Sequence, residues 1–394
     1  MLVRAIVAWA ALTAPTALPA LPALIGGSAP VWPGTAPREV DEGDLGRNVS
    51  GLAFSTDGRV LWAVRDDPGS LLRLVLDGDG EYVVDDGWGD GRELRWPDGS
   101  GEPDAEAVTV ADDRSDVVYV AAERDNDDAA TSRLSVLEIP VDAGGDAHDE
   151  LVATRSWDLT MSLPAADANT GLEGITWVPD SVVVAAGLVD SQGVAYDPAD
   201  HPGHGSGVFV VGSEHDGALD VFVLGDRATR LATVPSGLPS VMEVAFDAAT
   251  GELWAACDEH CDGAIVRLAF DGGGLTVTGS VEPPDELVAL NDEGLAIGPC
   301  IDGSQSVVWS DDAATDDHVL RAATIDCTDA AETSGAAETS DTSETSETSD
   351  TASDAAAGAS GGDRGRGTGV ALIAGIAILA AVGVGIAIRW PRRR

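Results

Sequence analysis

One stretch of the sequence carries the pattern that decides the fold: residues 243–256, EVAFDAATGELWAA. An acidic residue opens an apolar run, a turn rich in Asp and Gly follows at 247–251, and a second apolar run contains Trp254. Alternating apolar positions on both sides of such a turn are typical of two antiparallel β-strands. The stretch therefore predicts a β-hairpin, and helical periodicity is nearly absent around it.

The same order of signals recurs along the chain. Similar first strands begin at Ser50, Glu106, Glu173 and Glu293, and most units add a second and a third strand. Repeated units of about 50 to 70 residues predict an all-β fold, a β-propeller, and a β-sandwich with chance similarity between its strands is the alternative. The third repeat, residues 173–234, is long enough to hide an extra blade, so the sequence predicts five or six blades.

The two ends of the chain predict export and a membrane anchor. Residues 1–29 join an early charge to an apolar stretch and then to small residues and prolines, which is the layout of a signal peptide; an uncleaved anchor is the alternative. Residues 370–388 contain only Val, Ala, Leu, Ile and Gly, enough for one transmembrane helix. Arginines in the tail, 389–394, place that end in the cytoplasm. We expect a single-pass cell-membrane protein whose ectodomain, 40–327, is extracellular.

Composition restricts the partners of that ectodomain. The net charge is −46 and the chain has no lysine, so its surface repels nucleic acid and suits cations. Residues 328–369 repeat Glu, Thr and Ser and then become Gly-rich, which predicts a disordered stalk between the ectodomain and the membrane helix. The expected partners are the membrane, through the C-terminal helix, and a small-molecule ester or a surface ligand.

The four cysteines predict two disulfides. An even number of cysteines in an exported chain favours disulfides, and proximity favours the pairs Cys257–Cys261 and Cys300–Cys327. A zinc site at Cys257, His260 and Cys261 is the alternative, although a second pair of ligands with suitable spacing is missing.

Carboxylates are expected to gather at one end of the central channel. The start of one strand and the end of its antiparallel partner lie at the same edge, so acids at both positions converge on the channel mouth. Hard oxygen ligands favour Ca²⁺ or Mg²⁺ over zinc. The alternative is that each glutamate caps backbone N–H groups of a turn. The candidate metal ligands are Glu106, Glu173, Glu243, Glu293, Asp66, Asp258 and Asp311.

Several motifs resemble one known family. The segments 169–174, 253–261 and 290–297, together with Trp309–Asp312 and the closing Cys327, are similar to those of the phytase-like β-propeller family, usually labelled "esterase-like activity of phytase". The resemblance spans most of residues 48–327. It implies that calcium ions neutralise the acids and hold a phosphate ester while water attacks.

The resemblance leads to a hypothesis of a metal-dependent ester or phosphoester hydrolase, with Glu173 and Glu293 as metal ligands or general bases. Phosphate binding normally also uses Lys or Arg, and Arg65 and Arg124 are the arginines expected near the acidic face. The alternative is a non-catalytic cell-surface propeller that binds a ligand or a protein, because propellers serve both roles.

Overall fold

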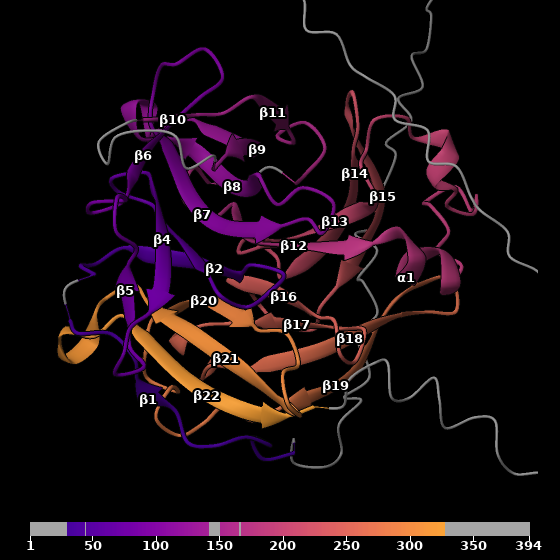
Figure 1. The fold of residues 1–394 in the computed structure, drawn as a ribbon. Coiled ribbons are helices and arrows are strands. Elements are labelled where there is room, and N and C mark those ends of the chain that lie inside the picture. Colours follow the sequence, from indigo (N-terminus) through magenta and orange to yellow (C-terminus); the bar gives the residue numbers. More distant parts are fainter. Residues whose placement is uncertain (1–29, 44, 142–149, 165–166, 328–394) are drawn as a thin grey trace, which may run out of the picture. The chain divides into compact units, whose positions relative to one another are not determined.

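The computed structural model describes residues 30–43, 45–141, 150–164 and 167–327, which form an all-β protein with very little helix. The strands make five sheets, and each sheet is one blade of a β-propeller around a central channel (Figure 1). The predicted propeller is confirmed. It has five blades, and a sixth is not found in the described part of the chain.

Blades 1 to 4 use their strands in chain order from the channel outward, and blade 5 does so for its first three strands. Blade 1 contains β2 (Val49–Phe54), β3 (Leu61–Arg65), β4 (Ser70–Leu76), β6 (Arg92–Arg95) and β10 (Leu151–Val152), with β5 (Tyr82–Val84) beside β4. Blade 2 contains β7 (Pro103–Val110), β8 (Val117–Asp125), β9 (Ser132–Pro140) and β11 (Arg155–Asp158). Blade 3 contains β12 (Leu172–Pro179), β13 (Gly207–Ser213), β14 (Ala218–Leu224) and β15 (Ala228–Pro235). Blade 4 contains β16 (Glu243–Asp247), β17 (Glu252–Ala256), β18 (Ile265–Asp271) and β19 (Gly274–Val281). Blade 5 contains β20 (Asp292–Ile297), β21 (Ser304–Asp311), β22 (Leu320–Asp326) and β1 (Arg38–Glu39).

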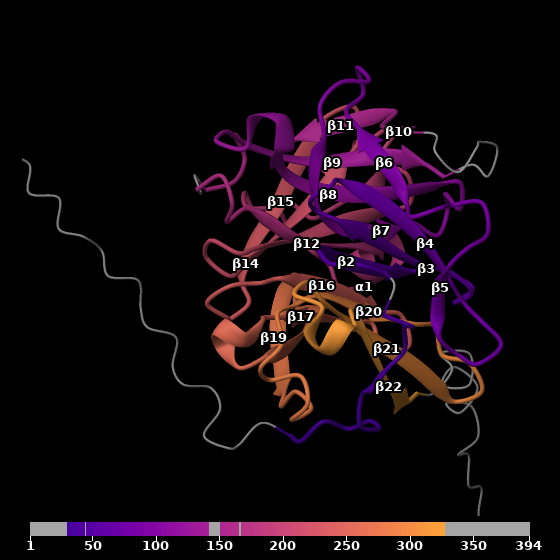
Figure 2. The same ribbon diagram turned by 90° about the vertical axis from the view of Figure 1, so that its left-hand side faces the viewer.

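The ring is closed by the N-terminal strand. β1 pairs antiparallel with β22, with Arg38 opposite Ala322, and thereby becomes the outer strand of the last blade. This strand is only two residues long, and the sequence pattern did not predict it. The inner strands β2, β7, β12, β16 and β20 contact one another in that order, and β20 contacts β2 (Figures 1 and 2).

Alternating side chains within a strand serve two different blade interfaces. Along β17, Leu253 and Ala255 pack with blade 3, whereas Trp254 and Ala256 pack with blade 5. Because successive side chains of a strand point to opposite faces of the sheet, an uninterrupted apolar run fits a blade that is buried on both faces. One apolar cluster lies at each of the blade interfaces.

The length of the third repeat comes from an insertion. Between β12 and β13 the chain forms the short helix α1 (Asp180–Ala185) and the 3₁₀ turn η2 (Pro198–Asp200). His204, in a Gly-rich loop of this insertion, uses Nε2 to contact Asp180 at 2.9 Å and Nδ1 to contact the carbonyl of His201. Both ring nitrogens of His204 are therefore engaged within the insertion. The other 3₁₀ turns are η1 (Asn126–Asp128), η3 (Glu259–Cys261) and η4 (Thr315–Asp317).

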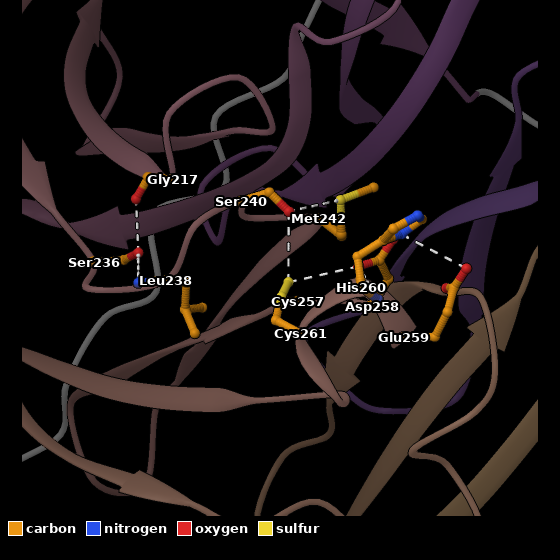
Figure 3. Close-up of a disulfide and its surroundings, with 10 residues drawn as sticks. All are labelled: Gly217, Ser236, Leu238, Ser240, Met242, Cys257, Asp258, Glu259, His260 and Cys261. Atoms are coloured by element: carbon orange, nitrogen blue, oxygen red, sulfur yellow. Dashed lines mark hydrogen bonds and ion pairs between the residues drawn. A yellow bond between two sulfur atoms is a disulfide. The ribbon is translucent and has the colours of Figure 1, made fainter.

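Both predicted disulfides are confirmed. Cys257 pairs with Cys261 across η3, and Cys300 pairs with Cys327. Figure 3 shows the first of these beside Asp258, His260 and Ser240. The second links the start of blade 5 to the end of the described chain, and so holds the C-terminal end of β22 in place.

The predicted signal peptide (1–29), stalk (328–369), membrane helix (370–388) and cytoplasmic tail (389–394) lie outside the described residues. Within the described ranges, no helix is both long and apolar enough to cross a membrane.

Candidate metal centre at the channel mouth

One end of the channel, where the inner strands begin, collects buried carboxylates from several blades. Glu106 lies on β7, Glu173 on β12 and Glu293 on β20. Glu173 repels Glu106 and is itself repelled by Glu293, so the three carboxylates are electrostatically linked. Asp66 follows β3 and repels both Glu106 and Glu293. We call this end the acidic mouth, defined by Asp66, Asp104, Glu106, Glu123, Glu173 and Glu293.

Irregularities in strand pairing turn three of these side chains toward the acidic mouth. Glu106, Glu173 and Glu293 each fall where the register with the second strand shifts, as the unpaired residue of a β-bulge. A bulge re-aims a side chain that regular pairing would send to a blade face. β16 has no such shift, because Glu243 pairs directly with Ala256.

Glu243 consequently takes the capping role that was the alternative in the sequence analysis. One of its oxygens accepts the backbone N–H groups of Val244 at 2.8 Å and Ile175 at 3.2 Å, and the other faces the N–H of Leu52 at 3.4 Å. Its carboxyl group therefore crosses the channel and joins the inner strands of three blades. Burial raises its pKa well above the usual range, and the three N–H groups oppose that shift.

Asp66, Asp104 and Glu106 form the tightest group of acids, which we call the Asp104 cluster. One carboxylate oxygen from each lies within 4.8 Å of the others. Asp104 was missing from the sequence prediction, although it stands two residues before Glu106, and a spacing of two places side chains on the same side of a strand. That spacing is the signal that could have identified it.

Asp104 is the member that most strongly fits a bound cation. Its side chain is fully buried, at 0% exposure, and neither carboxylate oxygen has a hydrogen bond of regular geometry with the described residues, although the side chain of Asn126 is a polar neighbour. The guanidinium of Arg124 lies 2.5 Å from one oxygen without hydrogen-bond geometry. A buried carboxylate without hydrogen bonds is costly unless a positive charge compensates it.

Arg124 is the arginine that reaches the acidic mouth. Besides Asp104 it contacts Glu123 at 3.5 Å and donates to the carbonyl of Ala168 at 3.0 Å. Arg65, the other arginine expected here, instead donates to the backbone carbonyls of Asp90, at 2.7 Å, and of Leu45.

Burial and mutual repulsion raise the pKa values of the acidic mouth. Burial is the largest cause for Asp104, whose pKa rises to about 7, and for Glu123, whose pKa rises to about 8. Burial followed by repulsion from neighbouring carboxylates raises the pKa values of Glu106 and Glu173 well above the usual range. Several of these groups therefore hold protons at neutral pH, and a cation entering the mouth would displace them.

The remaining predicted ligands lie apart from the Asp104 cluster and have partners of their own. Asp258 accepts the backbone N–H of His260 at 3.0 Å and contacts its ring at 2.8 Å (Figure 3). Asp311 accepts the N–H groups of Ala313 and Thr315 and faces Arg321 at 3.4 Å. Both carboxylates thus cap turns at the edge of blades 4 and 5.

Comparison with known proteins identifies no family for this chain. No family model matches it, and no curated protein sequence matches it. A chain in the crystal structure of a nidogen/laminin complex is 13% identical, with a TM-score of 0.34, over 70% of this chain and 83% of that one. A protein of Thermus thermophilus, assigned as an oxidoreductase of the glucose dehydrogenase type, is 16% identical, with a TM-score of 0.39, over 73% and 99%. The resemblance to the phytase-like family rests on the sequence motifs alone.

Proposed function

We propose that the acidic mouth binds a divalent cation, Ca²⁺ in the first place, through Asp66, Asp104 and Glu106. We further propose that the protein uses this site at the cell surface as an ester or phosphoester hydrolase. The observation that carries the proposal is the fully buried carboxylate of Asp104, whose oxygens lack hydrogen bonds of regular geometry within the described chain and which has one guanidinium, that of Arg124, against several neighbouring acids.

The choice of Ca²⁺ follows from the ligand atoms. The Asp104 cluster offers only carboxylate oxygens, which suit hard cations such as Ca²⁺ and Mg²⁺. Glu173 is a neighbour with no side-chain hydrogen bond in the described residues, and it is available as a further ligand. Zinc is disfavoured here, because the cluster contains neither histidine nor cysteine.

Hydrolysis would use acids next to the cation. A bound cation would polarise the ester and activate water. Glu293 is positioned by Ser50, whose hydroxyl donates to it at 3.3 Å, and by Asn291, whose amide donates at 3.0 Å. Burial raises the pKa of Glu293 to about 8, so at neutral pH it holds a proton that it can give to a leaving group. Glu173 is the candidate general base once a bound cation has displaced the proton that its raised pKa otherwise retains.

A non-catalytic binding propeller is the second candidate, and Arg124 favours it. Phosphate recognition normally uses a guanidinium or ammonium group. The guanidinium of Arg124 is already occupied by Asp104, Glu123 and a backbone carbonyl. A cation held at the mouth would then orient a surface ligand instead of a reacting phosphate.

Calorimetric titration of the purified chain with Ca²⁺ tests the cation site. We expect saturable binding, with proton release seen as a dependence of the heat on the ionisation enthalpy of the buffer. Asp104→Asn should abolish or strongly weaken binding, whereas the matched variant Asp258→Asn should bind like the wild type. Equal binding by the wild type and Asp104→Asn contradicts the assignment.

Hydrolysis of p-nitrophenyl phosphate and p-nitrophenyl acetate separates the two candidate functions. Turnover that requires Ca²⁺ and falls in Glu293→Gln supports the hydrolase. Saturable Ca²⁺ binding without turnover on either ester, with and without chelator, supports the binding propeller.

A further inference from the structure

The channel opens into a cavity at the end opposite the acidic mouth. Its volume is about 420 Å³, and residues from the later parts of all five inner strands line it, together with the turns that follow. We call it the apolar pocket. A volume of this size is within the range of small-molecule sites in proteins, which are mostly apolar with a few polar groups.

Small side chains keep this space open. Equivalent positions of the five inner strands, read from the aligned strand patterns, carry alanine in three blades and threonine in two. They are Ala53, Thr109, Thr176, Ala245 and Ala296, and all of them line the pocket. A larger residue at any of them would reduce the volume, so the cavity follows directly from the sequence of the repeats.

Glu243 separates the apolar pocket from the acidic mouth. The residues whose N–H groups face its carboxyl group, Leu52, Ile175 and Val244, also line the pocket. Glu243 itself is almost fully buried, at 1% exposure, and is not part of the lining. A ligand in the pocket therefore contacts the apolar walls and does not compete with a cation at the mouth.

The residues of the walls are of the kinds that bind organic cations with alkyl substituents. Three aromatic residues, Phe54, Trp177 and Phe246, line the pocket from three different blades. Asp112 is the single charged residue in the described lining, and no arginine or histidine is part of it. Aromatic rings together with a carboxylate attract quaternary ammonium groups, whereas an anion would meet a chain of net charge −46.

We propose that the apolar pocket binds a small organic cation of the quaternary ammonium class. The alkyl groups of the ligand would lie among the walls built by Phe54, Trp177 and Phe246, with the charge toward Asp112 at the rim. The insertion of blade 3 contributes Val182 to the same rim. This site is independent of the proposed cation site and of any hydrolysis at the mouth.

The probe pair for the test is choline and its uncharged isostere 3,3-dimethylbutan-1-ol. We titrate each into the full chain at 150 mM NaCl, which screens weak attraction to the acidic surface at a Debye length of about 8 Å. Calorimetry and tryptophan fluorescence report binding. We expect saturable choline binding with one site per chain, and at least about tenfold weaker binding of the alcohol, as an aromatic site for cations requires.

Two blocking variants and one charge variant locate the site. Ala245→Leu fills the pocket and Val182→Trp covers its rim, and each should abolish choline binding while Ca²⁺ binding at the mouth stays unchanged. Thermal melting checks the fold of each variant. Asp112→Asn should weaken choline binding by about two- to fivefold, as expected for an exposed charge, while the neighbouring Asp113→Asn should not.

Three results would overturn the proposal. Absence of saturable choline binding removes the site, and equal binding by the wild type and by folded Ala245→Leu or Val182→Trp places choline elsewhere on the acidic surface. Equal affinity for choline and the alcohol rejects the ammonium class. None of these results affects the Ca²⁺ titration, so the two proposals fail independently.

Discussion

The two ends of one channel differ in chemistry although the same five strands build both. At the acidic mouth, Glu106, Glu173 and Glu293 stand on β-bulges and gather with Asp104, whose carboxylate oxygens have no hydrogen bond of regular geometry in the described residues. At the apolar pocket the same strands pair regularly and present alanine, threonine and aromatic side chains. The sequence places glutamates at the start of these strands, and the pairing register decides whether each one points into the mouth.

Glu243 marks the boundary between the two ends. It is a glutamate at the start of an inner strand like the others, but without a bulge it turns toward backbone N–H groups of three blades. We therefore expect the carboxylates of the acidic mouth to bind a ligand and to lower the stability of the ligand-free protein. We expect Glu243 and polar groups further along the channel to increase stability.

The largest expected effect is the pH dependence of stability in calcium-free protein. Glu123 and Glu293 have pKa values raised from 4.5 to about 8 in the folded chain. Between those values the folded state keeps protons that the unfolded state has lost, so the free energy of unfolding falls as pH rises. Each such group contributes up to about 1.4 kcal/mol per pH unit, and the contribution is fully lost above the folded pKa.

Chemical denaturation at a series of pH values, with chelator and with Ca²⁺, measures this effect. We expect stability to decline from about pH 5 to pH 8 in chelator, and Ca²⁺ to reduce the decline because it replaces the protons of the carboxylates that bind it, whereas Glu293 keeps its proton. A calcium-free chain that becomes more stable over this range would contradict the raised pKa values.

The next largest effect is expected from replacing a glutamate by glutamine at two positions, Glu106 and Glu243. The first variant is Glu106→Gln. Removing one carboxylate of the Asp104 cluster should weaken Ca²⁺ binding by on the order of 100-fold, as measured by calorimetry. Stability in chelator should stay equal or increase, because repulsion among the buried acids decreases. Wild-type affinity in Glu106→Gln would remove this residue from the site.

Glu243→Gln should show the opposite result. An amide in place of one oxygen would place an N–H donor against a backbone N–H, and a buried group left without its hydrogen bond costs about 1–3 kcal/mol. Denaturation should therefore reveal lower stability, while Ca²⁺ affinity remains that of the wild type. A large loss of Ca²⁺ affinity in this variant would mean that Glu243 belongs to the mouth.

These two glutamates also show how far the sequence alone leads. Alternating apolar runs and Asp/Gly turns predict the hairpins, and spacing predicts both disulfides, because these features depend on local pattern. The distinction between Glu106 and Glu243 depends on a one-residue shift in pairing with the second strand, which the alternation of apolar residues does not show. The closing strand Arg38–Glu39 is likewise fixed by a partner near the other end of the chain.

The smallest effect concerns two threonines at the apolar end. The hydroxyl of Thr176 accepts the backbone N–H of Phe246 at 3.0 Å, and that of Thr109 accepts the N–H of Trp177 at 3.2 Å. Both bonds connect inner strands of neighbouring blades. Thr176→Val keeps the shape of the side chain but removes the acceptor, so we expect the free energy of unfolding to fall by about 1 kcal/mol.

Chemical denaturation of Thr176→Val measures this contribution. The control is Thr229→Val, at an exposed position of β15, which should change stability very little. The other three blades carry alanine at the position of Thr176, so their inner strands lack this side-chain bond. If Thr176→Val is as stable as the wild type, side-chain bonds between inner strands add nothing at the apolar end. Stability there would then come from the apolar clusters between blades, and the polar links between inner strands that matter would lie toward the mouth, at Glu243.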